Sequence, residues 1–187
     1  MNFLSTYFSP APSQLLGLAA VLVIGLAFTL IGAAITGRYR YAPADILVGW
    51  AFCIVVFTLI GTQTNILFTP VTLAMGLFAI GCGIYVWKRD KRLLPAGAVK
   101  LLVLNILLFI IIAAMAPSQW DEFSHWLLAG SYLFEIDTFP RTGLEPPISI
   151  STYYPNGATL IPYLASRVSG HFVENASALF HILLLCS

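Results

Sequence analysis

The sequence predicts an all-α, polytopic membrane protein, and two observations support this fold class. Hydrophobic residues make up 59% of the 187 residues and charged residues only 9%, whereas a soluble domain carries roughly 25% charged residues. The apolar residues also form long unbroken runs, and a run of ~20 residues is enough to cross the hydrocarbon core of a bilayer. Only a helix satisfies its own backbone hydrogen-bonding groups in lipid, so we expect each run to be helical.

Residues 1–116 are predicted to form a transmembrane region with four complete membrane-spanning helices. The four apolar runs cover about residues 15–36, 44–61, 66–87 and 96–116. A fifth run begins near Asn175 and reaches Ser187, which is too short to span a bilayer. Either this run is a re-entrant helix or residues 175–187 are the start of a fifth transmembrane helix in a longer protein, and we expect the second.

The basic residues predict the orientation of these helices. Seven of the nine lie in or next to the two loops that follow the first and third runs: Arg38, Arg40, Lys88, Arg89, Lys91, Arg92 and Lys100. Short loops rich in Lys and Arg stay on the cytoplasmic side. The N-terminus and residues 117–174 are thus predicted to lie outside, on the periplasmic or extracellular side of a bacterial inner membrane. No basic residue precedes the first run, which argues against a cleaved signal peptide.

The external segment, residues 117–174, carries most of the acidic residues. Two juxtamembrane amphipathic helices are predicted in it. The first begins at Ser118, with Asp121 in the capping-box position, and is expected to lie along the membrane surface. The second covers residues 158–168 and is ended by Gly170.

Asp121 and Glu122 are the candidate catalytic residues. Adjacent carboxylates at a membrane surface can take a proton from an acceptor hydroxyl, or bind a divalent cation that offsets a phosphate leaving group. The alternative is that they only stabilise the helix dipole, by ~0.3–1 kcal/mol. His125 lies four residues after Asp121, on the same helical face, and is either a partner for its proton or an ordinary interfacial residue.

Arg141 and Arg167 are the two external cations, and either can meet a lipid-linked phosphate. The alternative is an ion pair with an acidic residue of the same segment, namely Asp137, Glu145 or Glu174. The cysteines form no CxxC pair, which favours packing over metal or redox chemistry. No organic cofactor is predicted, and a divalent cation stays open. The net charge of +1 gives no basis for nucleic-acid binding.

Two motifs of the external segment resemble a known family. The motifs are Trp120-Asp121-Glu122-Phe123-Ser124-His125-Trp126 and the turn Tyr153-Tyr154-Pro155-Asn156-Gly157. Together they look like the first external loop of the GT-C glycosyltransferases, which include protein O-mannosyltransferases and the aminoarabinose transferases of lipid A. The resemblance covers roughly residues 99–187. In the family this loop usually follows the first span, whereas here it follows the predicted fourth.

The resemblance implies transfer of a sugar, with inversion, from a polyprenyl-phosphate or polyprenyl-diphosphate donor to an acceptor on the external face, for envelope glycan or glycolipid assembly. It implies that Asp121 is the base and Glu122 its helper. The residues expected to bind substrate are His125, Arg141, Tyr154 and Arg167. The expected partners are the lipid-linked sugar and membrane lipid.

Two other functions stay open. The first is a transporter or polymerase-like membrane protein that handles a polysaccharide intermediate. It calls for functional polar groups within the spans, and these are few: Asp45, Gln63, Asn65, Asn105 and His181. The second is a non-catalytic assembly factor, in which the acidic loop is only a solvated cap.

Overall fold

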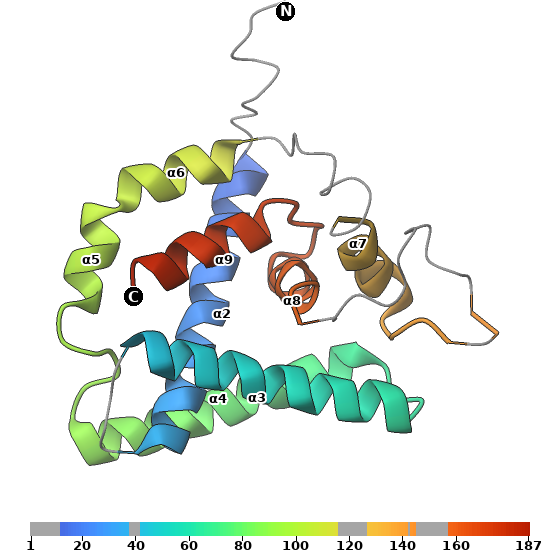
Figure 1. Cartoon of the computed structure of the whole chain (residues 1–187), viewed down its shortest axis with the longest axis horizontal. Helices are drawn as coiled ribbons and strands as arrows, with labels where there is room; N and C mark the ends of the chain where they lie inside the picture. The colour runs from blue at the N-terminus through green and yellow to red at the C-terminus, as the bar shows by residue number, and fades with distance from the viewer. Residues whose placement is uncertain (1–11, 38–41, 116–126, 142, 145–156) are drawn as a thin grey trace, which may run out of the picture.

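The computed structural model describes residues 12–37, 42–115, 127–141, 143–144 and 157–187, and these ranges contain helices and loops without any strand. The helices are α2 (Pro12–Thr36), α3 (Ala42–Gln63), α4 (Phe68–Asp90), α5 (Ala98–Leu104), α6 (Ile106–Ala114), α7 (Leu127–Ile136), α8 (Leu160–Ser169) and α9 (Ala176–Leu185). Figure 1 shows α2 running across α3 and α4, with α8 and α9 beside its N-terminal half and α7 packed against α8. The all-α prediction holds for the described ranges.

Three of the described helices are long and apolar enough to cross a membrane: Leu15–Thr36, Pro43–Gln63 and Phe68–Asp90. Their positions match the first three predicted spans. Large apolar side chains of α4, such as Leu73 and Leu77, are mostly exposed. A surface of this kind is stable in lipid rather than in water, so these helices indicate a membrane protein.

The fourth apolar run differs from the prediction of one unbroken helix. It is divided into α5 and α6, which meet at Asn105 and run in different directions (Figure 1). The backbone of Asn105 has φ −100° and ψ 8°, outside helical geometry. Its side-chain Nδ2 donates to the Leu101 carbonyl at 2.9 Å. Hydropathy reports composition and not helix continuity, and a side-chain amide that bonds locally competes with regular helix structure.

Glycines allow α2 and α3 to pack backbone against backbone. A Cβ atom added at Gly32 would lie 1.7 Å from the Asp45 carbonyl oxygen, and one added at Gly49 would lie 1.9 Å from that of Phe28. No side chain fits either gap. Close approach through small residues is the usual way that membrane helices associate.

Helix α2 is also the surface on which the later helices pack. Gly17 of α2 faces Val173, and Gly25 faces Leu183 of α9. One apolar core joins residues of α2, α3, α4, α6, α7, α8 and α9. The later helices therefore share a core with the long ones.

The predicted second amphipathic helix exists as α8, and Gly170 ends it with a φ of +77°. Its environment is different from the expected membrane surface, because every residue from Leu160 to Ser166 is buried. Helix α8 is thus an internal helix. The first predicted amphipathic helix is described only from Leu127 onward, as α7.

Candidate functional site

Asp137 follows the last residue of α7 and begins the path of the chain back toward α4. Its φ of +61° lies in the left-handed region, which Asp tolerates better than most residues. Its N–H still donates to the Leu133 carbonyl at 3.0 Å, so this residue ends α7. The turn directs the Asp137 side chain into the protein, where the residue is only 8% exposed.

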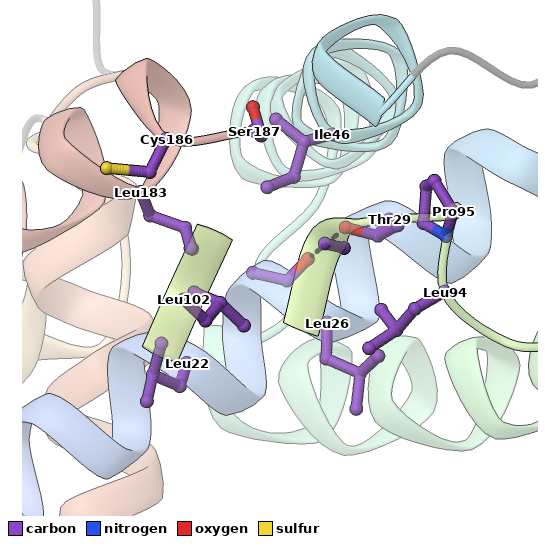
Figure 2. A pocket seen from close by; sticks show the side chains of 12 residues that line it. Leu22, Leu26, Thr29, Ile46, Leu94, Pro95, Leu102, Leu183, Cys186 and Ser187 are labelled. Carbon is purple, nitrogen blue, oxygen red and sulfur yellow. Dashed lines mark hydrogen bonds between the residues drawn. The ribbon is translucent and has the colours of Figure 1, made fainter. Parts of the chain in front are cut away.

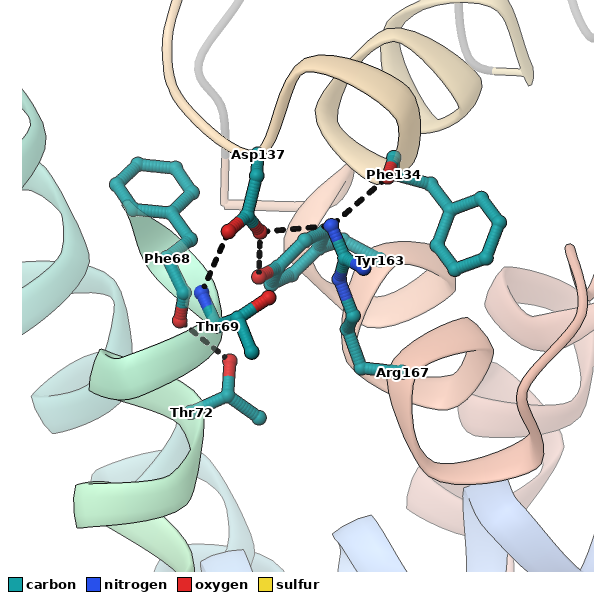
Figure 3. Close-up of polar contacts among 7 residues, drawn as sticks. All are labelled: Phe68, Thr69, Thr72, Phe134, Asp137, Tyr163 and Arg167. Carbon is teal, nitrogen blue, oxygen red and sulfur yellow. Dashed lines mark hydrogen bonds and ion pairs between the residues drawn. The ribbon is translucent and has the colours of Figure 1, made fainter. Parts of the chain in front are cut away.

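The Asp137 carboxylate is bound by three donors from two helices (Figure 3). Oδ1 accepts from Tyr163 Oη and from Arg167 Nη2, both at 2.7 Å. Oδ2 accepts from the backbone N–H of Thr69 at 3.0 Å. A buried carboxylate needs such partners, because an unpaired buried charge costs several kcal/mol.

Asp137 also caps α4 from a distant part of the sequence. The backbone N–H of Phe68 donates to the Asp137 carbonyl at 2.7 Å, alongside the bond from Thr69. The preceding residue, Leu67, supplies no side-chain cap. The first amides of a helix have no partner within the helix, and an acidic group there also interacts favourably with the helix dipole. Asp137 therefore supplies acceptors for two of the first amides of α4 and places a negative charge at the N-terminal end of this helix.

Arg167 holds the other side of this cluster. Besides Asp137, its Nη2 atom donates to the Phe134 carbonyl at 2.8 Å, close to the end of α7. The guanidinium carbon lies 4.9 Å from the ring centre of Phe134 and 5.3 Å from that of Tyr163, within cation–π range. Its Nε atom is buried and has no hydrogen-bond partner among the described residues. Arg167 thus ties α8 to the end of α7.

Tyr163 is fully buried and lies among aromatic rings. The rings of Phe57 and Phe68 lie edge-on to it, with centroids 6.1 and 5.9 Å away. Burial, together with the neighbouring Asp137 carboxylate, raises the pKa of Tyr163 to about 12. The hydroxyl therefore stays protonated and remains a donor to Asp137 at ordinary pH.

Arg141 has a different environment, at the turn between α3 and α4. Its Nη1 atom donates to the Thr64 carbonyl at 3.3 Å and to Asn65 Oδ1. Its Nη2 atom donates to Thr138 Oγ1 at 3.2 Å. These partners are neutral, and no carboxylate of the described residues forms an ion pair with Arg141. The positive charge of this guanidinium is thus held in place without being neutralised by them.

Of the predicted site residues, the structure describes two. Arg141 donates to Thr138 and Arg167 donates to Asp137, so both lie close to the 137–138 turn. Arg167 pairs with Asp137, which is one of the alternatives that the sequence left open. The other four predicted residues lie outside the described residues: Asp121, Glu122, His125 and Tyr154.

The sequence did not assign the capping role of Asp137. One signal was present, because Tyr163 and Arg167 are four residues apart and so share a helix face. No pattern in the sequence shows which acid faces them or which helix start lies beside it.

A separate cavity of about 240 Å³ lies between α2, α3, α5 and α9 (Figure 2). Its lining is almost entirely apolar, with Leu22, Leu26 and Ile46 among the side chains shown. The hydroxyl of Thr29, which also lines it, donates to the Gly25 carbonyl. Its lining contains no acidic, basic or histidine side chain. Among the described residues there is also no cluster of three or more His, Cys, Asp or Glu that could hold a metal ion.

Comparisons with family models, with curated protein sequences and with solved structures find no match for this chain. The resemblance to GT-C glycosyltransferases rests on the sequence motifs alone. The described structure contributes the geometry of the Asp137 cluster and of Arg141.

Proposed function

We propose that this chain belongs to a membrane glycosyltransferase of the GT-C type. In this proposal it transfers a sugar from a polyprenyl-phosphate or polyprenyl-diphosphate donor to an acceptor on the external face of a bacterial inner membrane. The fourth apolar run also crosses the membrane, as α5 and α6. Asp121 is the base and Glu122 assists it.

The observation that carries the proposal is the position of residues 137–141 relative to the long helices. Asp137 contacts the first residues of α4, and Arg141 contacts the turn that precedes them. Lys88 and Arg89 lie at the opposite end of α4, and a helix of 23 residues is about 34 Å long at ~1.5 Å per residue. The segment that follows the acidic motif is therefore one span away from the basic loop. This separation supports an external acidic loop and a cytoplasmic basic loop.

The second support is the rigid attachment of α7, which begins shortly after Asp121 and Glu122. The end of α7 is fixed by Asp137 to α4 and by Arg167 to α8. Catalytic groups need a supporting framework that holds them in a productive geometry. A helix fixed at its far end is a framework of this kind.

The proposed reaction is a direct displacement. A carboxylate of the acidic pair removes the proton of the acceptor hydroxyl while its oxygen attacks the anomeric carbon of the donor sugar. The bond from that carbon to the phosphate oxygen breaks, and the polyprenyl phosphate leaves with the electron pair. The configuration at the anomeric carbon inverts. Arg141 is the better placed of the two arginines to offset the leaving charge, because Asp137 already neutralises Arg167.

The test is sugar transfer by the complete protein, produced from its own reading frame, in isolated membranes supplied with radiolabelled polyprenyl-phosphate-linked hexose. Asp121→Asn should lower transfer at least about 100-fold, the usual contribution of a general base, without lowering the amount of protein in the membrane. The matched control is Glu135→Gln, which removes an exposed carboxylate from α7. Normal transfer by both Asp121→Asn and Glu122→Gln would favour the assembly-factor alternative and overturn the proposal.

A further inference from the structure

A second apolar groove, of about 370 Å³, lies on the outside of α4 beside α2. It is lined by Leu30, Ile80, Gly83, Ile84, Trp87, Lys88 and Leu93. Five of these residues belong to α4 and recur at three- and four-residue intervals, so they form one face of this helix. From Ile80 to Lys88 the face extends about 12 Å along the helix axis at ~1.5 Å per residue. The groove therefore runs along the surface of α4 from the middle of this helix toward its C-terminal end.

The groove exists because of the residues that bring α2 and α4 together. Ala79 and Cys82 of α4 pack against Leu30 and Ile31 of α2. Gly83 has no side chain, and a Cβ atom there would already lie 3.2 Å from Leu30 Cδ1. The floor of the groove is therefore this glycine, while Ile80, Ile84 and Trp87 remain more than half exposed beside it.

One end of the groove carries positive charge. Lys88 lines it, and residues 88–92 contain four basic residues and one acid. The acid, Asp90, is bound by Arg89 at 2.7 Å, and Arg89 also donates to the Ala33 carbonyl at the end of α2. Lys88 and Lys91 are exposed. An apolar slot that ends in lysines matches a molecule with a hydrocarbon chain and an anionic head.

We propose that this groove binds an anionic diacyl phospholipid, with one acyl chain along Ile80 to Ile84 and the phosphate beside Lys88. Trp87 lies between Ile84 and Lys88 on this face, and indole side chains prefer the interface between lipid and water. A zwitterionic phospholipid offers the same chain but no net charge. Each basic residue near an anionic lipid surface strengthens binding about fivefold. The site requires only that α4 crosses the membrane and does not depend on the proposed sugar transfer.

The test uses the complete protein with every tryptophan except Trp87 replaced by Phe, including Trp50, Trp120 and Trp126. Phosphatidylglycerol with brominated acyl chains quenches tryptophan fluorescence on contact. It should reach half-maximal quenching of Trp87 at about one fifth of the mole fraction that brominated phosphatidylcholine requires. Lys88→Gln should remove this preference, whereas Lys100→Gln, which removes the same charge away from the groove, should keep it.

A second pair of variants tests the apolar part. Gly83→Leu fills the floor of the groove and should weaken quenching by both lipids, whereas Gly81→Leu adds the same side chain where nothing lies within 4 Å. Native mass spectrometry of the protein with all its tryptophans should show more retained phosphatidylglycerol than phosphatidylcholine. Soluble glycerol phosphate should not compete with the lipid, because it lacks the chain. Three results would each overturn the proposal. They are equal quenching by the two lipids, an equal loss of the preference for phosphatidylglycerol in Lys88→Gln and Lys100→Gln, and competition by glycerol phosphate.

Discussion

Arg167 on α8 and Asp137 at the end of α7 form an ion pair of 2.7 Å between side chains that are 25% and 11% exposed. The same carboxylate accepts the Tyr163 hydroxyl and a backbone amide at the start of α4. One acidic side chain therefore connects three helices. This connection leads to the first two predictions.

Removing the Asp137 carboxylate should destabilise the protein strongly. Asp137→Asn leaves Arg167 without its counter-charge, and we expect the free energy of unfolding to fall by about 2–3 kcal/mol, below the value for a fully buried pair because Arg167 is partly exposed. Thermal unfolding in detergent measures this change. Glu135→Gln, two residues earlier and exposed, should change stability by less than about 0.5 kcal/mol. Equal effects of the two substitutions would contradict the pairing.

Tyr163 should make stability depend on pH in the alkaline range. Its pKa is raised from 10.0 to about 12, so the folded state holds this proton more tightly than the unfolded chain does. The contribution of this proton to the free energy of unfolding is complete below about pH 10 and is lost as the pH rises toward about 12. Tyr163→Phe should remove this part of the pH dependence and lower stability at neutral pH by about 1–2 kcal/mol, through the lost hydrogen bond.

The measurement is the unfolding midpoint at a series of alkaline pH values. Tyr85→Phe is the control, because Tyr85 is 54% exposed. If the unfolding midpoint of Tyr163→Phe fell with alkaline pH as steeply as that of the natural protein, the buried Tyr163 hydroxyl would not be the source of the pH dependence.

The contact between α2 and α3 predicts opposite effects for two kinds of glycine. Gly32→Ala and Gly49→Ala place a methyl group against a backbone oxygen, so each should cost about 3 kcal/mol, the upper range for overpacking. Gly76→Ala meets nothing within 4 Å on an exposed part of α4. It should stabilise the protein by about 0.5–1 kcal/mol, because Ala favours helix. Thermal unfolding of the three variants checks the difference in sign.

The Asn175 side chain should stabilise the C-terminal end of α6. Its Nδ2 atom donates to the Ala113 carbonyl at 3.0 Å, to that of Ile112 at 3.3 Å and also to that of Met115. Asn175→Ala should cost about 1–2 kcal/mol by leaving these carbonyls without this donor. Asn175→Asp should cost more, because it adds negative charge at a helix C-terminus. Glu174→Gln, at the exposed neighbour, is the control in the same unfolding experiment. An Asp variant as stable as the Ala variant would speak against this role.

The sequence predicted the parts of the fold that depend on local composition. The first three spans were found from apolar runs, and the end of α8 was found from Gly170, whose φ is positive. The break at Asn105 was missed, because one amide hardly changes the hydropathy of a long run. The burial of α8 was missed as well, since the same apolar pattern suits a membrane surface and a protein interior.

The candidate site was harder to predict because its contacts are distant in sequence. Arg167 had three possible acidic partners, and only packing decides that Asp137 is the one it meets. The cap of α4 joins residues 68 positions apart, and no periodicity carries this information. The structure begins α4 at Phe68, after Leu67, whose side chain cannot accept a hydrogen bond, so the acceptors for this helix start come from elsewhere in the chain.

The distant cap of α4 has a consequence for biosynthesis. A ribosome releases Phe68 and Thr69 well before it makes Asp137, so a nascent third span enters the membrane with its first amides lacking their final acceptor. That helix reaches its finished form only when the later chain folds back upon it. Folding of α4 is thereby linked to the segment that is made after it, and a chain cut short before Asp137 should be more sensitive to proteolysis although α2, α3 and α4 are complete.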